Sequence, residues 1–337
     1  MGVMVPGGVL AFDAGNSKTD VALVAADGTV LGTARGGGFE PQKVGPDGAV
    51  AGLEPMVRAA AAEAGLVLGP QPLVQQISAC LANADLPIEE EWLTAAFEAR
   101  GWAESVYVTN DTFALLRSGV DEPRGVAVVC GAGINCSGML PDGRTARFPA
   151  LGKLTGDWGG GAQLAEEAFW SASRADDGRG PATALLTALP AYYGMPSLSA
   201  LIEAFHFGEL PAERQLEAGP VLFQVAAAGD AVALGIIQQQ AEEIVAMAVS
   251  ALRRLDLLAE PVTVVLGGGV LTAGHSVLVD RVVQLLAEVA PKAIPRLVDV
   301  PPVVGAALLG LDHTGAGVAA QARLRAAFQL ERGSAVV

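Results

Sequence analysis

Residues 12–19 read FDAGNSKT, and a similar glycine turn, CGAGINC, occupies residues 130–136. An apolar stretch enters each turn, and a second stretch that ends in an Asp-Gly pair follows it, at Asp27-Gly28 and at Asp142-Gly143. Asp-Gly between apolar runs is a strong hairpin signal. The chain therefore repeats one supersecondary unit of strand, glycine turn and strand, which predicts a duplicated fold.

We expect phosphate to be the ligand of both glycine turns. A residue without a Cβ can adopt positive φ and bring backbone N–H groups within hydrogen-bonding reach of an anion. The turns do not match the better-known phosphate motifs. The sequence has no Gly-x-x-x-x-Gly-Lys followed by Ser or Thr, and Cys136 stands where a dinucleotide-binding fingerprint requires its third glycine.

The composition favours a globular protein that acts on small molecules. The chain has 337 residues, of which 51% are hydrophobic and 17% charged, and its formal net charge is −15. This length predicts two domains, since a single core stops growing at about 250–300 residues. The negative charge opposes binding to nucleic acid or to an anionic membrane.

The compartment is expected to be the cytoplasm. The N-terminal residues lack the features of a targeting signal, and charge or glycine interrupts the apolar segments before the roughly 20 residues that a membrane span needs. The cysteines, Cys80, Cys130 and Cys136, are too few for a disulfide framework or a zinc cluster. We expect free, structural thiols.

Strands and helices alternate along the chain, which predicts an α/β architecture. We expect an N-terminal domain over residues 1–117, joined by a C-terminal helix over about 315–337, and a C-terminal domain over 118–314. The loop at 36–42 is expected to be mobile enough to close on a ligand. The predicted strands form an antiparallel meander over 9–35 and lie at 73–80, 105–108, 126–129 and 262–266. The predicted helices lie at 53–64 and 89–100, from 230 past 254, and at 301–310 and 319–330.

Five motifs follow one another in a telling order: the Asp-x-Gly turn at Asp13, Asp111 after a strand, the Gly-x-Gly turn, Gly156-Asp157, and the triple glycine at 267–269. This arrangement resembles the actin, hexokinase and Hsp70 superfamily of ATP-dependent two-domain proteins. Within it, nearly the whole chain is similar to the N-acetylglucosamine kinase group and its BadF/BadG/BcrA/BcrD-type relatives. The segment DTFALL at residues 111–116 looks like that of bacterial glucosamine kinases.

The resemblance implies an α/β, two-domain actin-like ATPase fold, a duplicated ribonuclease H-like fold with an interdomain cleft. It also implies ATP and Mg²⁺ as cofactors, a small-molecule amino sugar as the partner, and a homodimer.

For individual residues the resemblance implies a phosphoryl-transfer site, in which the protein positions the reactants and stabilises charge. Asp111 would be the general base that accepts the proton of a sugar hydroxyl, and Asp13 would hold Mg²⁺, usually through water. The nucleotide phosphates would contact Gly15, Asn16, Ser17, Lys18 and Thr19 in the first turn and Gly131, Ala132 and Gly133 in the second. Adenine and ribose would lie against Gly267, Gly268 and Gly269. The sugar would contact Gln42, Asn135, Gly156 and Asp157.

The chain departs from this family at its sugar loops. Residues 39–42 lack the asparagine that often meets the sugar, and residues 152–154 lack the tryptophan that packs near the acetyl group in the animal enzymes. These departures favour glucosamine, phosphorylated on its 6-hydroxyl, because its ammonium could pair with a carboxylate such as Asp157. N-acetylglucosamine is the alternative substrate.

Structural interpretations and other functions stay open at this point. Asp13 could stabilise its own turn, residues 15–19 could be a polar hairpin tip, and Asn110-Asp111 could be a helix cap. An ATPase activator of a radical dehydratase would need cysteines placed to hold an iron–sulfur cluster between two subunits, whereas Cys130 and Cys136 flank a phosphate turn. A sugar-sensing DNA-binding module conflicts with the acidic charge.

Overall fold

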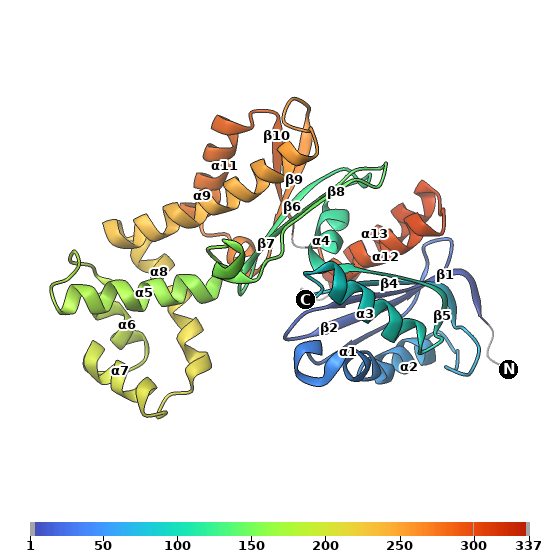
Figure 1. The fold of residues 1–337 in the computed structure, drawn as a ribbon, viewed down its shortest axis with the longest axis horizontal. Coiled ribbons are helices and arrows are strands. Elements are labelled where there is room, and N and C mark those ends of the chain that lie inside the picture. The colour runs from blue at the N-terminus through green and yellow to red at the C-terminus, as the bar shows by residue number, and fades with distance from the viewer. Residues whose placement is uncertain (1–3, 299, 335–337) are drawn as a thin grey trace. The chain divides into compact units, whose positions relative to one another are not determined.

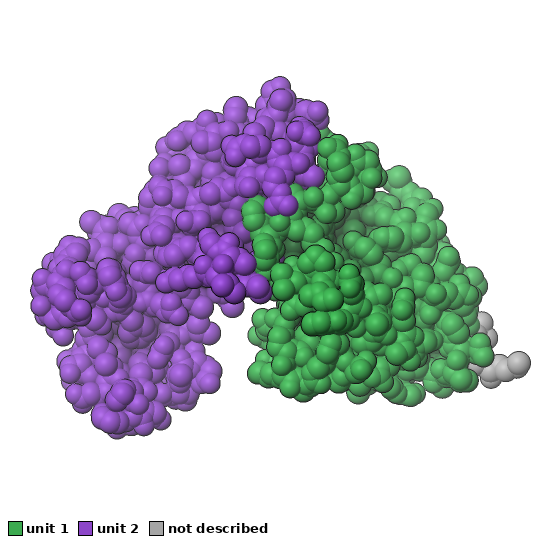
Figure 2. Space-filling view, in the orientation of Figure 1, with its two compact units in different colours: residues 1–127, 137–149, 298–337 green, residues 128–136, 150–297 purple. Residues whose placement is uncertain are grey.

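The computed structural model describes residues 4–298 and 300–334 and contains two five-stranded sheets flanked by helices (Figure 1). The contacts within the chain divide it into two compact units (Figure 2). Unit 1 contains the described parts of Met1–Ala127, Ser137–Pro149 and Val298–Val337, and unit 2 contains Val128–Cys136 and Ala150–Leu297.

The sheet of unit 1 has the strand order β3-β2-β1-β4-β5. Its first three strands form the predicted antiparallel meander, and β4 and β5 continue the sheet parallel to β1. The strands are β1 (Val5–Ala14), β2 (Thr19–Val24), β3 (Val30–Gly36), β4 (Val74–Leu81) and β5 (Ala103–Asn110).

Helices cover both faces of this sheet, so its central strand is apolar on both sides. Leu10 and Phe12 of β1 belong to the core that α1, α2 and α3 complete, whereas Val9 lies against Gly310 of α12. The helices of unit 1 are α1 (Pro41–Ala51), α2 (Glu54–Glu63), α3 (Pro87–Glu98), α4 (Asp111–Gly119), α12 (Pro302–His313) and α13 (Val318–Ser334).

The second sheet has the order β10-β9-β6-β7-β8, and the division into units passes through it. Its strands are β6 (Gly125–Cys130), β7 (Ile134–Met139), β8 (Thr145–Arg147), β9 (Val262–Gly267) and β10 (Ala293–Leu297). The helices of unit 2 are α5 (Gly161–Asp176), α6 (Leu185–Tyr192), α7 (Leu198–His206), α8 (Ala218–Ala227), α9 (Ala231–Arg254), α10 (Gly269–Thr272) and α11 (Ser276–Val289), with 3-10 turns η1 (Gly152–Thr155) and η2 (Ala212–Glu217).

Local signals in the sequence account for the helix boundaries. The Asp230 side chain accepts hydrogen bonds from the amides of Val232 and Ala233 and so caps α9 as predicted. Pro302 starts α12, because proline has no N–H to leave unpaired in the first turn.

Among residues 4–298 and 300–334, no single helix has the length and hydropathy to cross a membrane; one pair bent by 112°, Ala212–Ala227 with Ala231–Arg254, passes that test by length and composition.

Candidate active site

Three parallel strands of unit 1 end side by side, and polar residues follow each end. Asp13 of β1 lies in register with Cys80 of β4, which lies in register with Thr109 of β5. Because parallel strands place their carboxyl ends at one edge, Asp13, the 83–85 loop after β4, and Asp111 after β5 share that edge of the sheet. Neighbouring strands are about 4.8 Å apart, so the backbones of Asp13 and Thr109, two residues before Asp111, lie roughly 10 Å apart.

Asp111 is the first residue of α4, but it is not the helix cap. The Asn110 side chain does the capping: its Oδ1 accepts hydrogen bonds from the Thr112 amide at 3.0 Å and from the Thr112 hydroxyl at 2.7 Å. Burial raises the pKa of Asp111 from 3.8 to about 6, while hydrogen bonds from the amides of Thr112 and Asp111 lower it. The Asp111 carboxylate therefore has a local environment that suits a base.

Asp13 has an environment of excess negative charge. Burial, then Asp111 and Asp20, raise the pKa of Asp13 from 3.8 to about 8, and Lys18 and Arg35 oppose them. Asp20 is itself paired with Arg35, whose Nε and Nη2 donate to its two oxygens at 2.5 and 3.0 Å. A cation beside Asp13 would relieve this repulsion.

The first glycine turn presents the predicted phosphate-binding residues at its tip. Asn16, Ser17 and Lys18 are exposed, and the Gly15 amide donates to the Lys18 carbonyl at 2.8 Å. Thr19 is buried at the start of β2, and its hydroxyl has no hydrogen-bond partner among the described residues.

A residue that the sequence argument did not select, Asn83, ties this turn to the next loop. Its Nδ2 donates to Asn16 Oδ1 at 2.6 Å and to the Phe39 carbonyl at 3.2 Å. Asn83 has φ of 66°, a left-handed conformation that asparagine tolerates better than most residues. The predicted loop at 36–42 is thus anchored: Phe39 is buried and donates its amide to Gly15, and the loop already becomes helix at Pro41.

Asp85 is a second residue without a predicted role. Its Oδ1 accepts a hydrogen bond from Asn110 Nδ2 at 2.9 Å, and its amide donates to Glu89 Oε2 at 3.0 Å. Burial, followed by Asp111 and Glu89, raises the pKa of Asp85 from 3.8 to about 7, and Arg147 lowers it. The position of Asn83 and Asp85 directly after a buried strand was the only signal in the sequence.

The second glycine turn lies in unit 2, between β6 and β7. The Gly131 amide donates to the Gly133 carbonyl at 2.9 Å, and Gly131, Ala132 and Gly133 are at least partly exposed. The prediction that glycine serves positive φ in these turns is wrong, since Gly15, Gly131 and Gly133 do not have it. Their missing side chains leave the turn surface open, because a Cβ on Gly131 or Gly133 would meet no atom within 4 Å.

Other glycines of unit 2 adopt the left-handed conformation and pack against the backbone of the second glycine turn. Gly160 has φ of 88°, and a Cβ there would lie 2.4 Å from Gly133 Cα. Gly161 and Ala162 donate their amides to the carbonyls of Gly131 and Ala132 at 2.8 and 3.0 Å. Gly268, between Gly267 of β9 and Gly269 of α10, also has φ of 88° and packs against the backbone of Cys130.

The predicted sugar contacts of unit 2 are held by local hydrogen bonds. Asn135 lies on β7 with its Oδ1 accepting from the Cys136 amide at 2.7 Å. Asp157 follows η1 and accepts from the Thr155 hydroxyl at 2.5 Å, and Gly156 is the left-handed cap of η1 with φ of 86°. Gly156 thus has a structural reason of its own to be glycine.

Gln240 of α9 completes this region and was not predicted. Its Oε1 accepts from the Gly160 amide at 2.8 Å, and its side chain leaves no room for a Cβ on Gly159. The Gln240 Nε2 is buried and has no hydrogen-bond partner among the described residues. No periodic or spacing signal marks this residue, because it is one polar position on a long, largely buried helix.

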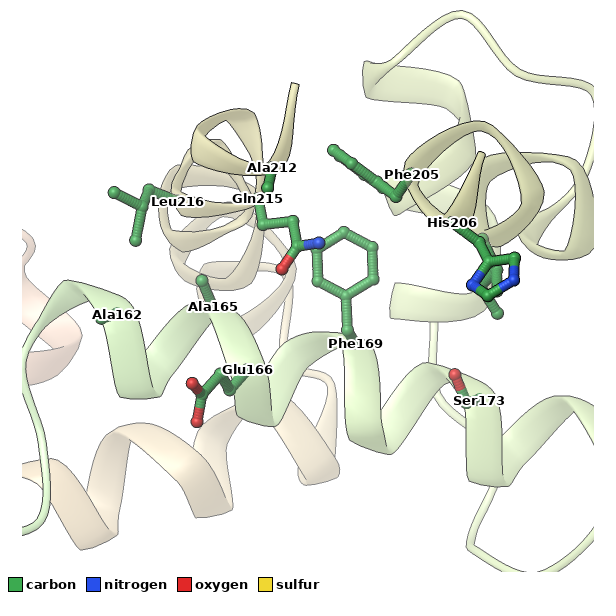
Figure 3. Close-up of a pocket in the computed structure, with 11 residues that line it drawn as sticks. Ala162, Ala165, Glu166, Phe169, Ser173, Phe205, His206, Ala212, Gln215 and Leu216 are labelled. Atoms are coloured by element: carbon green, nitrogen blue, oxygen red, sulfur yellow. The ribbon is translucent and has the colours of Figure 1, made fainter. Parts of the chain in front are cut away.

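A pocket of about 540 Å³ lies along α5 in unit 2, beginning at Ala162 beside the second turn (Figure 3). Phe169 and Ala165 of α5 form one wall, and Phe205 and His206 of α7 form another. Gln215 of η2 extends its carboxamide toward the Phe169 ring (Figure 3). This pocket offers aromatic surface together with groups that can both donate and accept a hydrogen bond, such as the Gln215 carboxamide and the Ser173 hydroxyl.

The cysteines are free, as predicted, and all three are buried. Burial raises the pKa of the Cys130 thiol to about 12 and that of Cys136 higher still. Within the part of the chain that the structure describes, no three His, Cys, Asp or Glu side chains are grouped so as to hold a metal ion by themselves.

Two mixed sheets, each with a glycine turn between its first two antiparallel strands, and an aspartate at the end of a parallel strand define the duplicated α/β fold of the actin-like ATPases. The family can also be stated. The chain belongs to the BadF/BadG/BcrA/BcrD ATPase family, whose model matches residues 10–310.

Two curated relatives are similar in sequence. The N-acetylmuramic acid/N-acetylglucosamine kinase of Clostridium acetobutylicum is 24% identical over 269 residues, which cover 78% of this chain and 85% of the relative. The N-acetyl-D-glucosamine kinase of Dictyostelium discoideum is 26% identical over 245 residues, covering 70% of this chain and 75% of the relative.

Two solved structures share the fold. A candidate N-acetylglucosamine kinase from Chromobacterium violaceum has a TM-score of 0.69 at 23% identity and covers 90% of this chain and 98% of its own. A ROK family glucokinase from Streptomyces griseus, solved with glucose and AMPPNP, has a TM-score of 0.56 at 18% identity, with the same coverage.

Proposed function

We propose that this protein is an ATP-dependent sugar kinase. It transfers the γ-phosphate of ATP to the 6-hydroxyl group of an N-acetylated amino sugar. The observation that carries the proposal is Asp111. Its carboxyl lies at the sheet edge that Asp13 shares, and it accepts hydrogen bonds from the amides of Thr112 and Asp111 while the Asn110 side chain caps the helix. The family membership and the names of the two relatives support a kinase of this class.

Asp111 would act by orienting the sugar hydroxyl and accepting its proton. As the hydroxyl oxygen bonds to the γ-phosphorus, the bond from that phosphorus to the β,γ-bridging oxygen breaks, ADP leaves, and the proton passes to the Asp111 carboxylate. A base is most effective when its pKa lies near the working pH. The raised pKa of Asp111, about 6, is closer to neutrality than that of an exposed aspartate.

Asp13 is the residue that would hold Mg²⁺. The ion usually keeps several waters and takes one or two carboxylates along with the nucleotide phosphates, so it needs no cluster of three protein ligands. The excess negative charge around Asp13 fits a divalent cation. When bound, Mg²⁺ neutralises charge on the phosphates.

The two glycine turns would supply backbone amides to the nucleotide. Unit 1 offers Gly15 to Thr19, with Lys18 exposed at the tip, and unit 2 offers the open surface of Gly131 to Gly133. The amides of Gly15 and Gly131 bond within their turns and shape them, so the contacts to phosphate would come from the residues that follow. Adenine and ribose would extend from the second turn past Gly268 and into the pocket of Phe169 and Gln215. The continuity of this pocket with the turn, through Ala162, supports that placement.

The preference for an acetylated sugar corrects the one drawn from the sequence. The expectation of glucosamine rested on missing loop residues, whereas both curated relatives are named for N-acetylated sugars. Asn135 and Asp157 in unit 2 and Gln42 in unit 1 remain the proposed contacts to the sugar. Glucosamine is kept as a comparison substrate.

The radical dehydratase activator is less well supported. That function needs thiolates at a surface, where two subunits hold an iron–sulfur cluster. Cys80, Cys130 and Cys136 are all buried, and their raised pKa values keep them protonated.

The test measures kinase activity on a panel of sugars and compares the unaltered chain with a variant at Asp111. The chain is assayed for ADP release with N-acetylglucosamine, glucosamine, N-acetylmuramic acid and glucose, and the phosphorylated product is located by NMR. We expect turnover with at least one N-acetylated sugar, and Asp111→Asn to lower kcat by about 10²-fold or more while nucleotide binding is kept. Asp121→Asn, which changes an exposed aspartate beyond α4, is the control. Near-normal turnover by Asp111→Asn would remove Asp111 from the mechanism.

A further inference from the structure

We propose that a small pocket between α1 and α3 of unit 1 receives the acyl group on the nitrogen of the amino sugar, with the Trp92 ring as its platform. The inference rests on the proposed sugar kinase function and adds the residue that selects the acylated substrate. The pocket is lined by Pro41, Gln42 and Pro46 from α1, by Asn83 from the loop after β4, and by Glu89, Trp92 and Leu93 from α3.

The size of the pocket suits a substituent. Its volume is about 90 Å³, well below the roughly 300 Å³ at which pockets for whole ligands begin. Pro41, Pro46 and Leu93 provide apolar surface, the Gln42 carboxamide provides donors and an acceptor, and the Asn83 carboxamide oxygen provides a further acceptor. An acyl group has the same two parts, an alkyl end and a polar amide.

Hydrogen bonds connect the pocket wall to the proposed chemistry. Asn83 binds Asn16 at the tip of the first glycine turn. Glu89 accepts the amide of Asp85, and Asp85 accepts from Asn110, which caps the helix that begins at Asp111. The pocket therefore lies at the same sheet edge as the base, and its wall is held by the same residues that hold the base.

Trp92 is placed as a binding surface and has no core role. Its side chain is 54% exposed, whereas Leu93 and Phe97 of the same helix are 1% and 0% exposed. Trp102 stacks in the core on Phe12, and Trp170 packs under Arg174, but Trp92 has no ring or guanidinium against it among the described residues. An exposed indole beside a pocket can cover the methyl of an acetamido group.

An acyl group fits this wall better than an ammonium. Glu89 is the anionic residue of the wall, and its Oε2 already accepts the amides of Asp85 and Leu86 at 3.0 and 2.9 Å. The remaining lining is neutral, so the pocket favours a neutral amide over the charged amine of glucosamine.

The experiment compares Trp92→Ala with Trp170→Ala, which removes another exposed indole, on α5 of unit 2. For each protein, kcat/KM is measured with N-acetylglucosamine and with glucosamine. We expect Trp92→Ala to lose about tenfold or more with the acetylated sugar and less than about threefold with glucosamine. Trp92→Phe should keep most of the activity with the acetylated sugar, and Trp170→Ala should match the unaltered chain with both.

Binding is measured in parallel, by NMR saturation transfer from the protein to the acetyl methyl of N-acetylglucosamine. The signal should be strong with the unaltered chain and Trp170→Ala and weak with Trp92→Ala. Equal losses of kcat/KM with both sugars would overturn the acyl pocket and leave the kinase proposal intact. If no sugar is phosphorylated, the proposed function fails, and the methyl signal alone tests the pocket. The acyl pocket is then overturned if the methyl signal is absent, or if it is equally strong with the unaltered chain and with Trp92→Ala.

Discussion

At the scale of single residues, the notable feature is three carboxyls with raised pKa values in one unit. The pKa values of Asp13, Asp85 and Asp111 are raised to about 8, 7 and 6, because each is partly buried at or just beyond the end of a parallel strand and loses hydration there. Burying carboxylates in this way costs stability, so the arrangement points to binding or chemistry. It also makes the site sensitive to pH in a direction that can be worked out.

We predict that, at saturating Mg²⁺, kcat/KM falls below about pH 6, as the Asp111 base becomes protonated, and reaches a plateau above it. Saturating Mg²⁺ is needed because the pKa of Asp13 is raised to about 8, and a bound cation would lower it. Loss of folding should not cause this fall. A carboxyl with a raised pKa binds its proton more tightly in the folded state, so its contribution to stability is full below pH 3.8 and is lost as pH rises through the folded value.

The measurement is a pH profile of kcat/KM from 4.5 to 8.5, with thermal melting at each pH as the control. An acid limb centred near pH 4 would mean that the Asp111 carboxyl titrates like an exposed one, contrary to the prediction.

At the scale of elements, the sequence patterns located most strands of the described chain and the helices α2, α3, α9, α12 and α13, because their signals are local. The meander β1 to β3, the capped helix α9 and the proline-started helix α12 all follow from neighbouring residues. Helix α1 was not predicted, because Gly45 and Pro46 interrupt it, and Gly45 has φ of 75° at a kink. Strand β10 was missed because it contains Pro295 and pairs only with β9.

The candidate site was predictable only in part, for a related reason. Asp13, Asp111 and the glycine turns are marked by their own neighbours in the chain. The contribution of Asn83 and Asp85 depends on β4 lying between β1 and β5, which is a property of the sheet order. Gln240 depends on which side of α9 faces the Gly159 loop.

The packing of α12 on α4 gives a prediction for these elements. A Cβ on Gly305 of α12 would lie 1.8 Å from the Ala114 carbonyl oxygen of α4. Gly305→Ala must push the helices apart, which typically costs about 1–3 kcal/mol. Because α4 begins at Asp111, we expect a lower melting temperature together with a lower kcat.

Gly235→Ala is the matched control for this substitution. Gly235 lies in α9, is exposed, and has open space where a Cβ would stand. Alanine there should stabilise the helix by about 0.5–1 kcal/mol and leave kcat unchanged. Equal melting temperatures for the two variants would contradict the close packing of α12 on α4.

At the scale of the molecule, the end of the chain completes unit 1. Arg117 of α4 is fully buried, and its guanidinium donates to Asp312 of α12, to Gln321 of α13 and to the Val120 carbonyl. Arg325 of α13 donates to the carbonyls of Arg117, Ser118 and Val120. The last two helices therefore hold the C-terminal end of the helix that carries Asp111.

We predict that Asp312→Ala lowers the free energy of unfolding by about 3–5 kcal/mol, because it leaves the buried Arg117 charge without its carboxylate. Arg323→Ala is the control. It removes an ion pair with Asp27 that is exposed on both sides, and little change is expected. Urea titrations followed by circular dichroism measure both variants, and similar midpoints for the two would show that the Arg117 pair contributes no more than a surface pair.

The buried Arg117 has a consequence for biosynthesis. Its partners at Asp312 and Gln321 lie about two hundred residues further along the chain. While a ribosome is still making unit 2, the Arg117 guanidinium lacks the Asp312 carboxylate. The sheet of β1 to β5 also lacks α12, which packs on one of its faces. The native arrangement of unit 1 can then form only after α12 and α13 have emerged, so nascent chains of this protein should depend on chaperones until that point.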